Sequence, residues 1–175
     1  KKQPNAQVTR LMNEYREMVG LEVFARGGSE MMRAVKAMKQ KKLLGFLADQ
    51  DGGFQGVPVM FLGQESSAVL GPATFAMKFK APVVPVFAYR KPDLSGHVVE
   101  IGKPLYYKDT GNEDEDLYRL TEETVRVTEE FIKQHPDEWL WFQHRWNTKL
   151  HEIVDIDKKL KVREAVHATE ATKPE

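Results

Sequence analysis

The chain has 175 residues, 41% hydrophobic and 30% charged, which is long enough and apolar enough for one globular domain with a sizeable core. The chain has 26 lysine and arginine residues in total and 26 aspartate and glutamate residues. Its net charge is therefore zero and provides no overall attraction for nucleic acid. The absence of cysteine excludes a disulfide framework, a thiolate zinc site and a cysteine nucleophile, while no apolar run reaches the roughly 20 residues of a membrane helix.

The first residue is Lys1 rather than methionine, so we expect the chain to be a piece of a longer one. Apolar residues at spacings of three and four predict a helix over residues 7–18, and a short strand is expected over 20–24. The next helix starts near residue 29 and ends in a lysine-rich run, 36–42. Because cations stabilise the last turn of a helix, we interpret this run as a solvated helix end, with phosphate binding as the less favoured alternative.

A buried strand is expected over residues 43–48, and a helix over 73–80 follows a Gly-Pro pair. The near-continuous apolar run at 81–89 predicts a strand that is covered on both faces, and residues 97–101 predict an antiparallel neighbour. A helix over 116–134 begins in an acidic run. This succession predicts an α/β fold with a mixed, largely parallel sheet flanked by helices on both faces.

Two carboxylates follow the strand at 43–48. Residues i and i+2 of an extended chain leave from the same face, so Asp49 and Asp51 can converge on one cationic or hydroxyl-bearing group. The alternative is an ordinary turn, since Asp and Gly are common turn residues. An EF-hand calcium loop is excluded, because Gly53 and Met60 occupy the third and closing ligand positions.

The segment Asp49-Gln50-Asp51-Gly52 also resembles the signature of the haloacid-dehalogenase phosphatases, in which the first aspartate is the nucleophile and the second the general acid. Gly53 stands where that signature has threonine, and its downstream lysine and acidic magnesium motif are not recognisable here. A serine hydrolase is not indicated either, because the chain lacks a Gly-x-Ser-x-Gly elbow. The phosphatase therefore remains an alternative with partial support.

Four ordered motifs support a different resemblance. They are residues 49–63, which begin with the two aspartates, then Gly71-Pro72-Ala73, then residues 81–86, and finally residues 136–146 with the sequence Pro-Asp-Glu-Trp-Leu-Trp-Phe-Gln-His-Arg-Trp. Together they resemble the bacterial lipid A biosynthesis acyltransferases, which belong to the lysophospholipid acyltransferase superfamily. The resemblance runs over roughly residues 20–149, and it implies a fold like that of glycerolphosphate acyltransferase with its N-terminal part missing.

The resemblance implies transfer of a fatty acyl chain from acyl carrier protein or acyl-CoA to a hydroxyl of a lipid A precursor or a related glycolipid or lysophospholipid. It implies no cofactor, no nucleic acid partner, and action on a membrane surface, the cytoplasmic face of the bacterial inner membrane. The family's catalytic His-x-x-x-x-Asp/Glu motif, a base and the acid that orients it, has no counterpart here, and we expect it upstream of residue 1.

Four residues match motifs that hold the acceptor in the family. Arg26 matches the arginine of the second motif, where a guanidinium grips phosphate in a bidentate manner. Asp49 and Asp51 match the acidic turn of the third motif, and Gly53 gives this turn its backbone freedom. The resemblance implies that the two carboxylates orient Arg26 or the sugar hydroxyls of the acceptor.

The remaining motifs have less defined roles. Residues 83–86 match the fourth motif, which is structural, and His144 with Arg145 matches the C-terminal signature. Arg145 either binds phosphate or packs, and the aromatic residues of 139–146 form either core or a membrane-facing edge. We expect residues 1–149 to be the C-terminal portion of an acyltransferase domain and 150–175 a polar, partly disordered or helical tail. A binding module that holds the acceptor without catalysis is the non-enzyme alternative.

Overall fold

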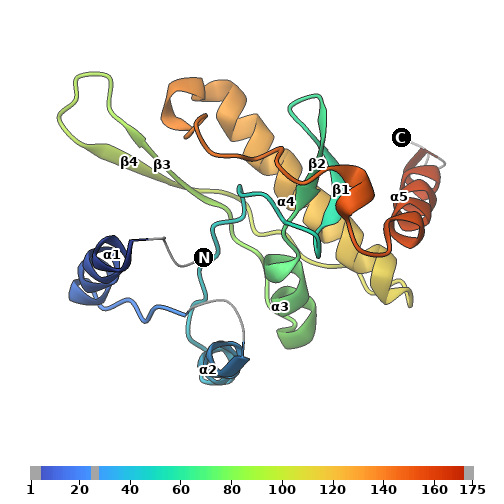
Figure 1. Ribbon diagram of the computed structural model, residues 1–175, viewed down its shortest axis with the longest axis horizontal. Helices are drawn as coiled ribbons and strands as arrows, with labels where there is room; N and C mark the ends of the chain where they lie inside the picture. Colours follow the sequence, from blue (N-terminus) through green and yellow to red (C-terminus); the bar gives the residue numbers. More distant parts are fainter. Residues whose placement is uncertain (1–4, 25–27, 172–175) are drawn as a thin grey trace. The chain divides into compact units, whose positions relative to one another are not determined.

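The computed structural model describes residues 5–24 and 28–171, and the chain divides into two units, Lys1–Gly45 and Phe46–Glu175. The first unit contains helices α1 (Ala6–Met18) and α2 (Gly28–Lys39). The second contains, in chain order, β1 (Val57–Phe61), β2 (Gln64–Ala68), α3 (Gly71–Phe79), β3 (Val86–Arg90), β4 (His97–Ile101), α4 (Glu113–Gln134), the short helices η1 (Pro136–Glu138) and η2 (Leu150–Glu152), and α5 (Ile156–Ala171) (Figure 1). The fold is mixed α/β, as predicted.

In the first unit, α1 begins at an asparagine cap. The side-chain oxygen of Asn5 accepts hydrogen bonds from the backbone N–H groups of Gln7 and Val8, at 2.9 and 3.2 Å, which satisfies two of the free donors of the first turn. No residue of α1 is buried, and its apolar stripe is exposed, comprising Val8, Leu11, Met12, Tyr15 and Met18. The helix predicted over 7–18 is confirmed.

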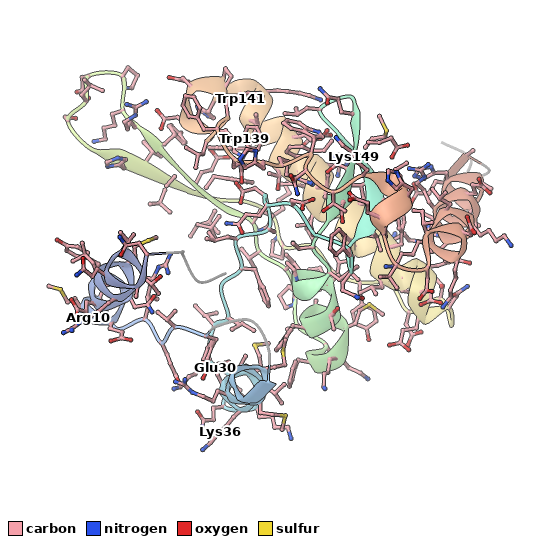
Figure 2. All side chains as sticks on the ribbon, viewed as in Figure 1. Arg10, Glu30, Lys36, Trp139, Trp141 and Lys149 are labelled. Carbon is pink, nitrogen blue, oxygen red and sulfur yellow. The ribbon has the colours of Figure 1, made fainter. Side chains whose placement is uncertain are left out.

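Arg33 connects α2 to residues 22–24, which precede it in the chain. Its guanidinium pairs with Glu22 at 2.7 Å and with Glu30 at 2.9 Å, and its Cζ lies 5.4 Å from the ring centroid of Phe24. Figure 2 shows Glu30 and Lys36 among the side chains of α2. Lys36 and Lys39 occupy the last turn, as the interpretation of the lysine run required.

The prediction of a largely parallel sheet was wrong for the described residues. They form two antiparallel pairs, β1 with β2 and β3 with β4. Each pair is joined by a short loop, whereas parallel neighbours need a crossover of a dozen or more residues. Leu62 and Gly63, both with positive φ, close the first hairpin as a two-residue loop. The expected strands over 20–24 and 43–48 have no ladder partner within residues 5–24 and 28–171, and Leu43 is fully exposed.

The larger core of the second unit surrounds β1. Val59 and Phe61 are buried there against Tyr118, Val125 and Ile132 of α4, together with Trp139 and Val166. Elements α4, α5 and β1 contact one another, and Figure 1 shows α4 passing beside the β1–β2 hairpin. Helix α5 lies in the part that the sequence describes as a polar tail, yet its Val166 has no exposed surface.

A smaller core joins α3 to α4. It consists of the buried Ala73, Ala76, Leu105 and Leu120, so the small residues of α3 permit close helix packing. Helix α4 is capped by Asn112, whose side chain accepts a hydrogen bond from the backbone N–H of Glu115. Both helices were predicted, and α4 begins three residues earlier than expected.

The β3–β4 hairpin is covered on one face only by the described residues. Phe87 stacks on Phe131 of α4 at 4.1 Å, whereas Val86 on the other face is 57% exposed. The prediction that residues 81–89 form a strand covered on both faces was therefore wrong here. The antiparallel partner was predicted with its bounds, 97–101.

Candidate functional site

The acidic turn, which we define as residues 49–53, is fastened to strand β2. The backbone N–H of Gly52 donates to the carbonyl of Ser67 at 3.0 Å, and the Ser67 hydroxyl donates to the carbonyl of Gly53 at 2.8 Å. Gly53 has a φ of +70°, a backbone conformation that residues with a side chain rarely adopt. A Cβ on Gly52 would lie 2.5 Å from the backbone of Ala68, so the turn approaches β2 more closely than a side chain permits.

The two aspartates are held from the C-terminal side. Asp49 Oδ2 accepts hydrogen bonds from Trp139 Nε1 and Gln143 Nε2, both at 3.1 Å. Asp51 Oδ2 accepts from the hydroxyl of Thr148 at 2.7 Å. The third motif and the C-terminal signature, which are nearly a hundred residues apart, therefore form one structure.

Arg145, which belongs to the same C-terminal signature, is completely buried. Its Nη1 donates to the Ser66 hydroxyl and to the Ser67 carbonyl, the latter at 2.6 Å. Its guanidinium carbon lies 4.4 Å from the ring centroid of Phe61, which is a cation–π contact. Of the two roles that the sequence left open for this arginine, packing is the one for which the structure shows contacts.

The electrostatics of Arg145 follow from its burial. Loss of hydration lowers the pKa of its guanidinium to about 10, and the negative charges of Asp51, Asp49 and Glu129 oppose that shift. The side chain thus remains a cation at neutral pH. Its Nε and Nη2, and Asp51 Oδ1, are buried without a hydrogen-bond partner among the described residues.

The structure brings together Asp49, Asp51, Gly53 and Arg145 of the six residues that the sequence indicated. His144 is exposed, and its ring has no hydrogen-bond partner among the residues that the structure describes. Arg26 lies outside the described residues, so its relation to the acidic turn stays a prediction.

The aromatic residues that follow α4 divide between core and surface. Trp139 is buried and contacts Phe61, Trp141 and Trp146, at centroid distances of 5.6, 4.7 and 6.0 Å. Figure 2 labels Trp139 and Trp141 on this segment. Trp141 is 49% exposed and Phe142 is 91% exposed. The two alternatives for this cluster therefore apply to different residues.

Sequence reasoning missed the polar residues that hold the turn. Ser66 and Ser67 are buried in β2, a strand whose sequence Gln-Glu-Ser-Ser-Ala is mostly polar. Gln143 and Thr148 flank Arg145 and bond the two aspartates. The available signal was the pair of serines directly before the apolar Ala68, because buried hydroxyls require hydrogen-bond partners.

Two further findings concern the site's surroundings. Within residues 5–24 and 28–171, no three His, Asp or Glu side chains form a group that could hold a metal ion. None of the helices over the same residues combines the length and the apolar character needed to cross a membrane.

Comparison with known families assigns the chain to a class of enzyme, the acyltransferases, which move an acyl group from a donor to an acceptor. The matching family model is that of the bacterial lipid A biosynthesis acyltransferases, and it covers residues 1–148. The chain belongs to this family, as the resemblance predicted. A search of curated proteins found no match. The match gives no support to the phosphatase alternative.

Proposed function

We propose that this chain forms the acceptor-holding part of an enzyme that acylates a hydroxyl of a lipid A precursor or a related lysoglycolipid. The donor is a thioester of acyl carrier protein or coenzyme A. Family membership supports the reaction class, and the acidic turn supports the assignment of the acceptor site. The single observation that carries the proposal is the joining of Asp49 to the C-terminal signature within the region that the family model covers.

The reaction follows from the groups that the proposal requires. The acceptor oxygen attacks the thioester carbonyl, the carbon–sulfur bond breaks, and the thiolate leaves. A histidine takes the proton of the hydroxyl and returns it to the departing sulfur, while a carboxylate fixes the histidine tautomer. We assign this pair to a His-x-x-x-x-Asp/Glu motif encoded upstream of Lys1.

The two aspartates have different roles in this proposal. Asp49 is half-buried, and its Oδ2 accepts hydrogen bonds from two donors, which leaves Oδ1 for a sugar hydroxyl of the acceptor. Asp51 Oδ1 is buried, so Asp51 holds the turn instead of reaching the acceptor. Gly53 supports the turn, and exposed His144 is free to approach the acceptor.

The assignment is tested with Arg26→Ala and Asp49→Asn in the complete protein. We expect both to raise the KM for the acceptor at least tenfold, about 1.4 kcal/mol, with a much smaller effect on the thioester KM. Asp93→Asn, an exposed carboxylate in the β3–β4 loop, is the matched control. Equal effects on both substrates would show that Arg26 and Asp49 are misassigned.

The catalytic pair is tested separately. The gene upstream of Lys1 is expected to encode a histidine with an acid five positions later, and replacing that histidine by alanine should abolish acyl transfer while leaving acceptor binding intact. A complete gene without such a pair would favour the binding module that lacks catalysis.

We further propose that the enzyme works on the cytoplasmic face of the bacterial inner membrane. The exposed Leu140, Trp141 and Phe142 support the membrane-surface part of this proposal, because indole and phenyl side chains favour the membrane interface. Flotation with phospholipid vesicles tests it: Phe142→Ser should reduce binding, whereas the exposed Val99→Ser should not. Equal binding of both variants would remove the aromatic residues from the proposal.

A further inference from the structure

Arg145 is the largest side chain that is completely buried among the described residues. A buried cation is costly unless opposite charge and hydrogen bonds compensate it, and an apolar side chain of similar volume fills the same space without that cost. Packing against Phe61 alone therefore does not account for an arginine here.

The neutral partners of Arg145 satisfy only part of its guanidinium. Nη1 donates to Ser66 and Ser67, whereas Nε and Nη2 have no partner among the described residues. No described carboxylate forms an ion pair with it at 4.0 Å or less. The balancing charge comes through space, from Asp51, Asp49 and, more weakly, Glu129.

The guanidinium and the acidic turn also meet at one atom. The carbonyl oxygen of Ser67 accepts both from Arg145 Nη1, at 2.6 Å, and from the backbone N–H of Gly52, at 3.0 Å. Gly52 directly follows Asp51 in the sequence. Displacement of the guanidinium would therefore disturb the position on β2 that anchors the turn next to Asp51.

We propose that Arg145 is a positioning residue for the acidic turn: its buried positive charge, and not only its bulk, holds Asp49 and Asp51 in place. Arg145 has no exposed surface, so it contacts neither donor nor acceptor and acts through Ser67 and through its charge. The functional consequence, placement of the acceptor, rests on the proposed function. The structural claim does not.

A thermal double-mutant cycle in the complete protein separates charge from bulk. Arg145→Met should lower the unfolding midpoint by roughly 5–15 °C, and by about half as much or less when Asp51→Asn is already present. Arg163→Met is the matched control. Arg163 pairs with Glu65 of β2, the strand that Arg145 contacts, and shares no partner with Asp51. Its effect should be the same in both backgrounds. Equal losses from Arg145→Met in both backgrounds would overturn the proposal.

Arg145→Lys keeps the positive charge but replaces the guanidinium group with a smaller ammonium group. We expect it to fold, to lose less than half of what Arg145→Met loses, and to lose similar amounts with and without Asp51→Asn, because the charge is kept. If Arg145→Met yields no folded protein, the cycle is measured with Arg145→Gln, which removes the charge but keeps a hydrogen-bonding side chain. Equal losses from Arg145→Gln in both backgrounds, or failure of the lysine variant to fold, would overturn the proposal.

Activity provides the second readout. With an acyl carrier protein thioester as donor, Arg145→Met should raise the acceptor KM at least fivefold and change the donor KM less than twofold, and Arg145→Lys should restore most of the loss. Unequal substrate effects are not expected from general destabilisation, and equal effects would overturn the positioning role. If the wild-type protein transfers no acyl chain, the proposed function fails while the thermal cycle still decides the role of Arg145.

Discussion

The two hairpins of the second unit have the same strand arrangement but differ in which of their residues are buried. Each pairs two five-residue antiparallel strands. In β1–β2, Val59 and the polar Ser67 have no exposed surface, whereas in β3–β4 the apolar Val86 and Ile101 are 57% and 70% exposed. From composition alone, the polar β2 would be expected to be exposed and the more apolar β4 to be buried, which is the reverse of what the structure shows.

The difference shows that partners determine burial in this protein. The β1–β2 hairpin is enclosed by α4, α5 and the segment after η1, and its serines satisfy both the buried arginine and the acidic turn. The β3–β4 hairpin contacts α4 through Phe87 and Tyr89 on one face. We therefore expect substitutions to be severe in the first hairpin and mild on the open face of the second.

The largest effect is expected from Phe61→Ala in β1. Phe61 contacts Trp139 and Trp146, at centroid distances of 5.6 and 5.8 Å, and supports the guanidinium of Arg145. Truncating a buried phenyl group leaves a cavity, so unfolding in urea should show a loss of about 3–5 kcal/mol. A loss below about 1 kcal/mol would mean that this core does not hold the site.

A glycine pair gives the next effect. A Cβ on Gly56 would lie 2.1 Å from Ser67 Oγ and 2.5 Å from the Ala68 carbonyl, whereas a Cβ on Gly96, in the β3–β4 loop, meets nothing within 4 Å. Gly56→Ala should cost about 1–3 kcal/mol by overpacking, while Gly96→Ala should cost less than about 0.5 kcal/mol. Denaturant unfolding compares them, and similar costs would contradict the contrast between the hairpins.

Tyr118→Phe should cost about 1 kcal/mol, because the buried hydroxyl lies 3.1 Å from the Pro58 carbonyl of β1. Burial, and then the charge of Glu122, raises the pKa of Tyr118. The folded state thus keeps a proton that the unfolded state releases above its ordinary pKa of 10.0, so this tyrosine's contribution to stability falls as pH rises beyond about 10. The difference between wild type and variant should shrink there, and a constant difference would contradict the sign.

The smallest effect is expected from Ile101→Thr in β4. The side chain is 70% exposed on the open face of its hairpin, so the change should alter the free energy of unfolding by less than about 0.5 kcal/mol. Thermal unfolding measures it beside Phe61→Ala. A loss above 2 kcal/mol would show that an additional partner covers this face in solution.

Local patterns predicted local elements well. The stripe at residues 7–18 and the acidic start of α4 indicated helices that the structure contains, and the bounds of β4 were predicted. The strands expected at 20–24 and 43–48 failed, since apolar character indicates burial but does not supply a ladder partner. Strand β2 was not predicted, because its polar sequence does not indicate a buried strand although it pairs with β1.

The candidate site was predictable in part. The aspartate spacing and Gly53 marked the turn, and the family motifs marked Arg145. The bonds from Trp139 and Gln143 to Asp49 were not predictable, because no local pattern specifies which distant donors meet a carboxylate. The complete burial of Arg145 was likewise not predictable, because burial depends on the tertiary structure.

The bonds that hold Asp49 also constrain how the protein is made. They join positions 90 and 94 residues apart, so their formation closes long loops at a cost in chain entropy. During synthesis from the N-terminus, the acidic turn leaves the ribosome long before its tryptophan and glutamine donors do. The acidic turn therefore lacks both of these hydrogen bonds until residues 139–143 have been synthesised.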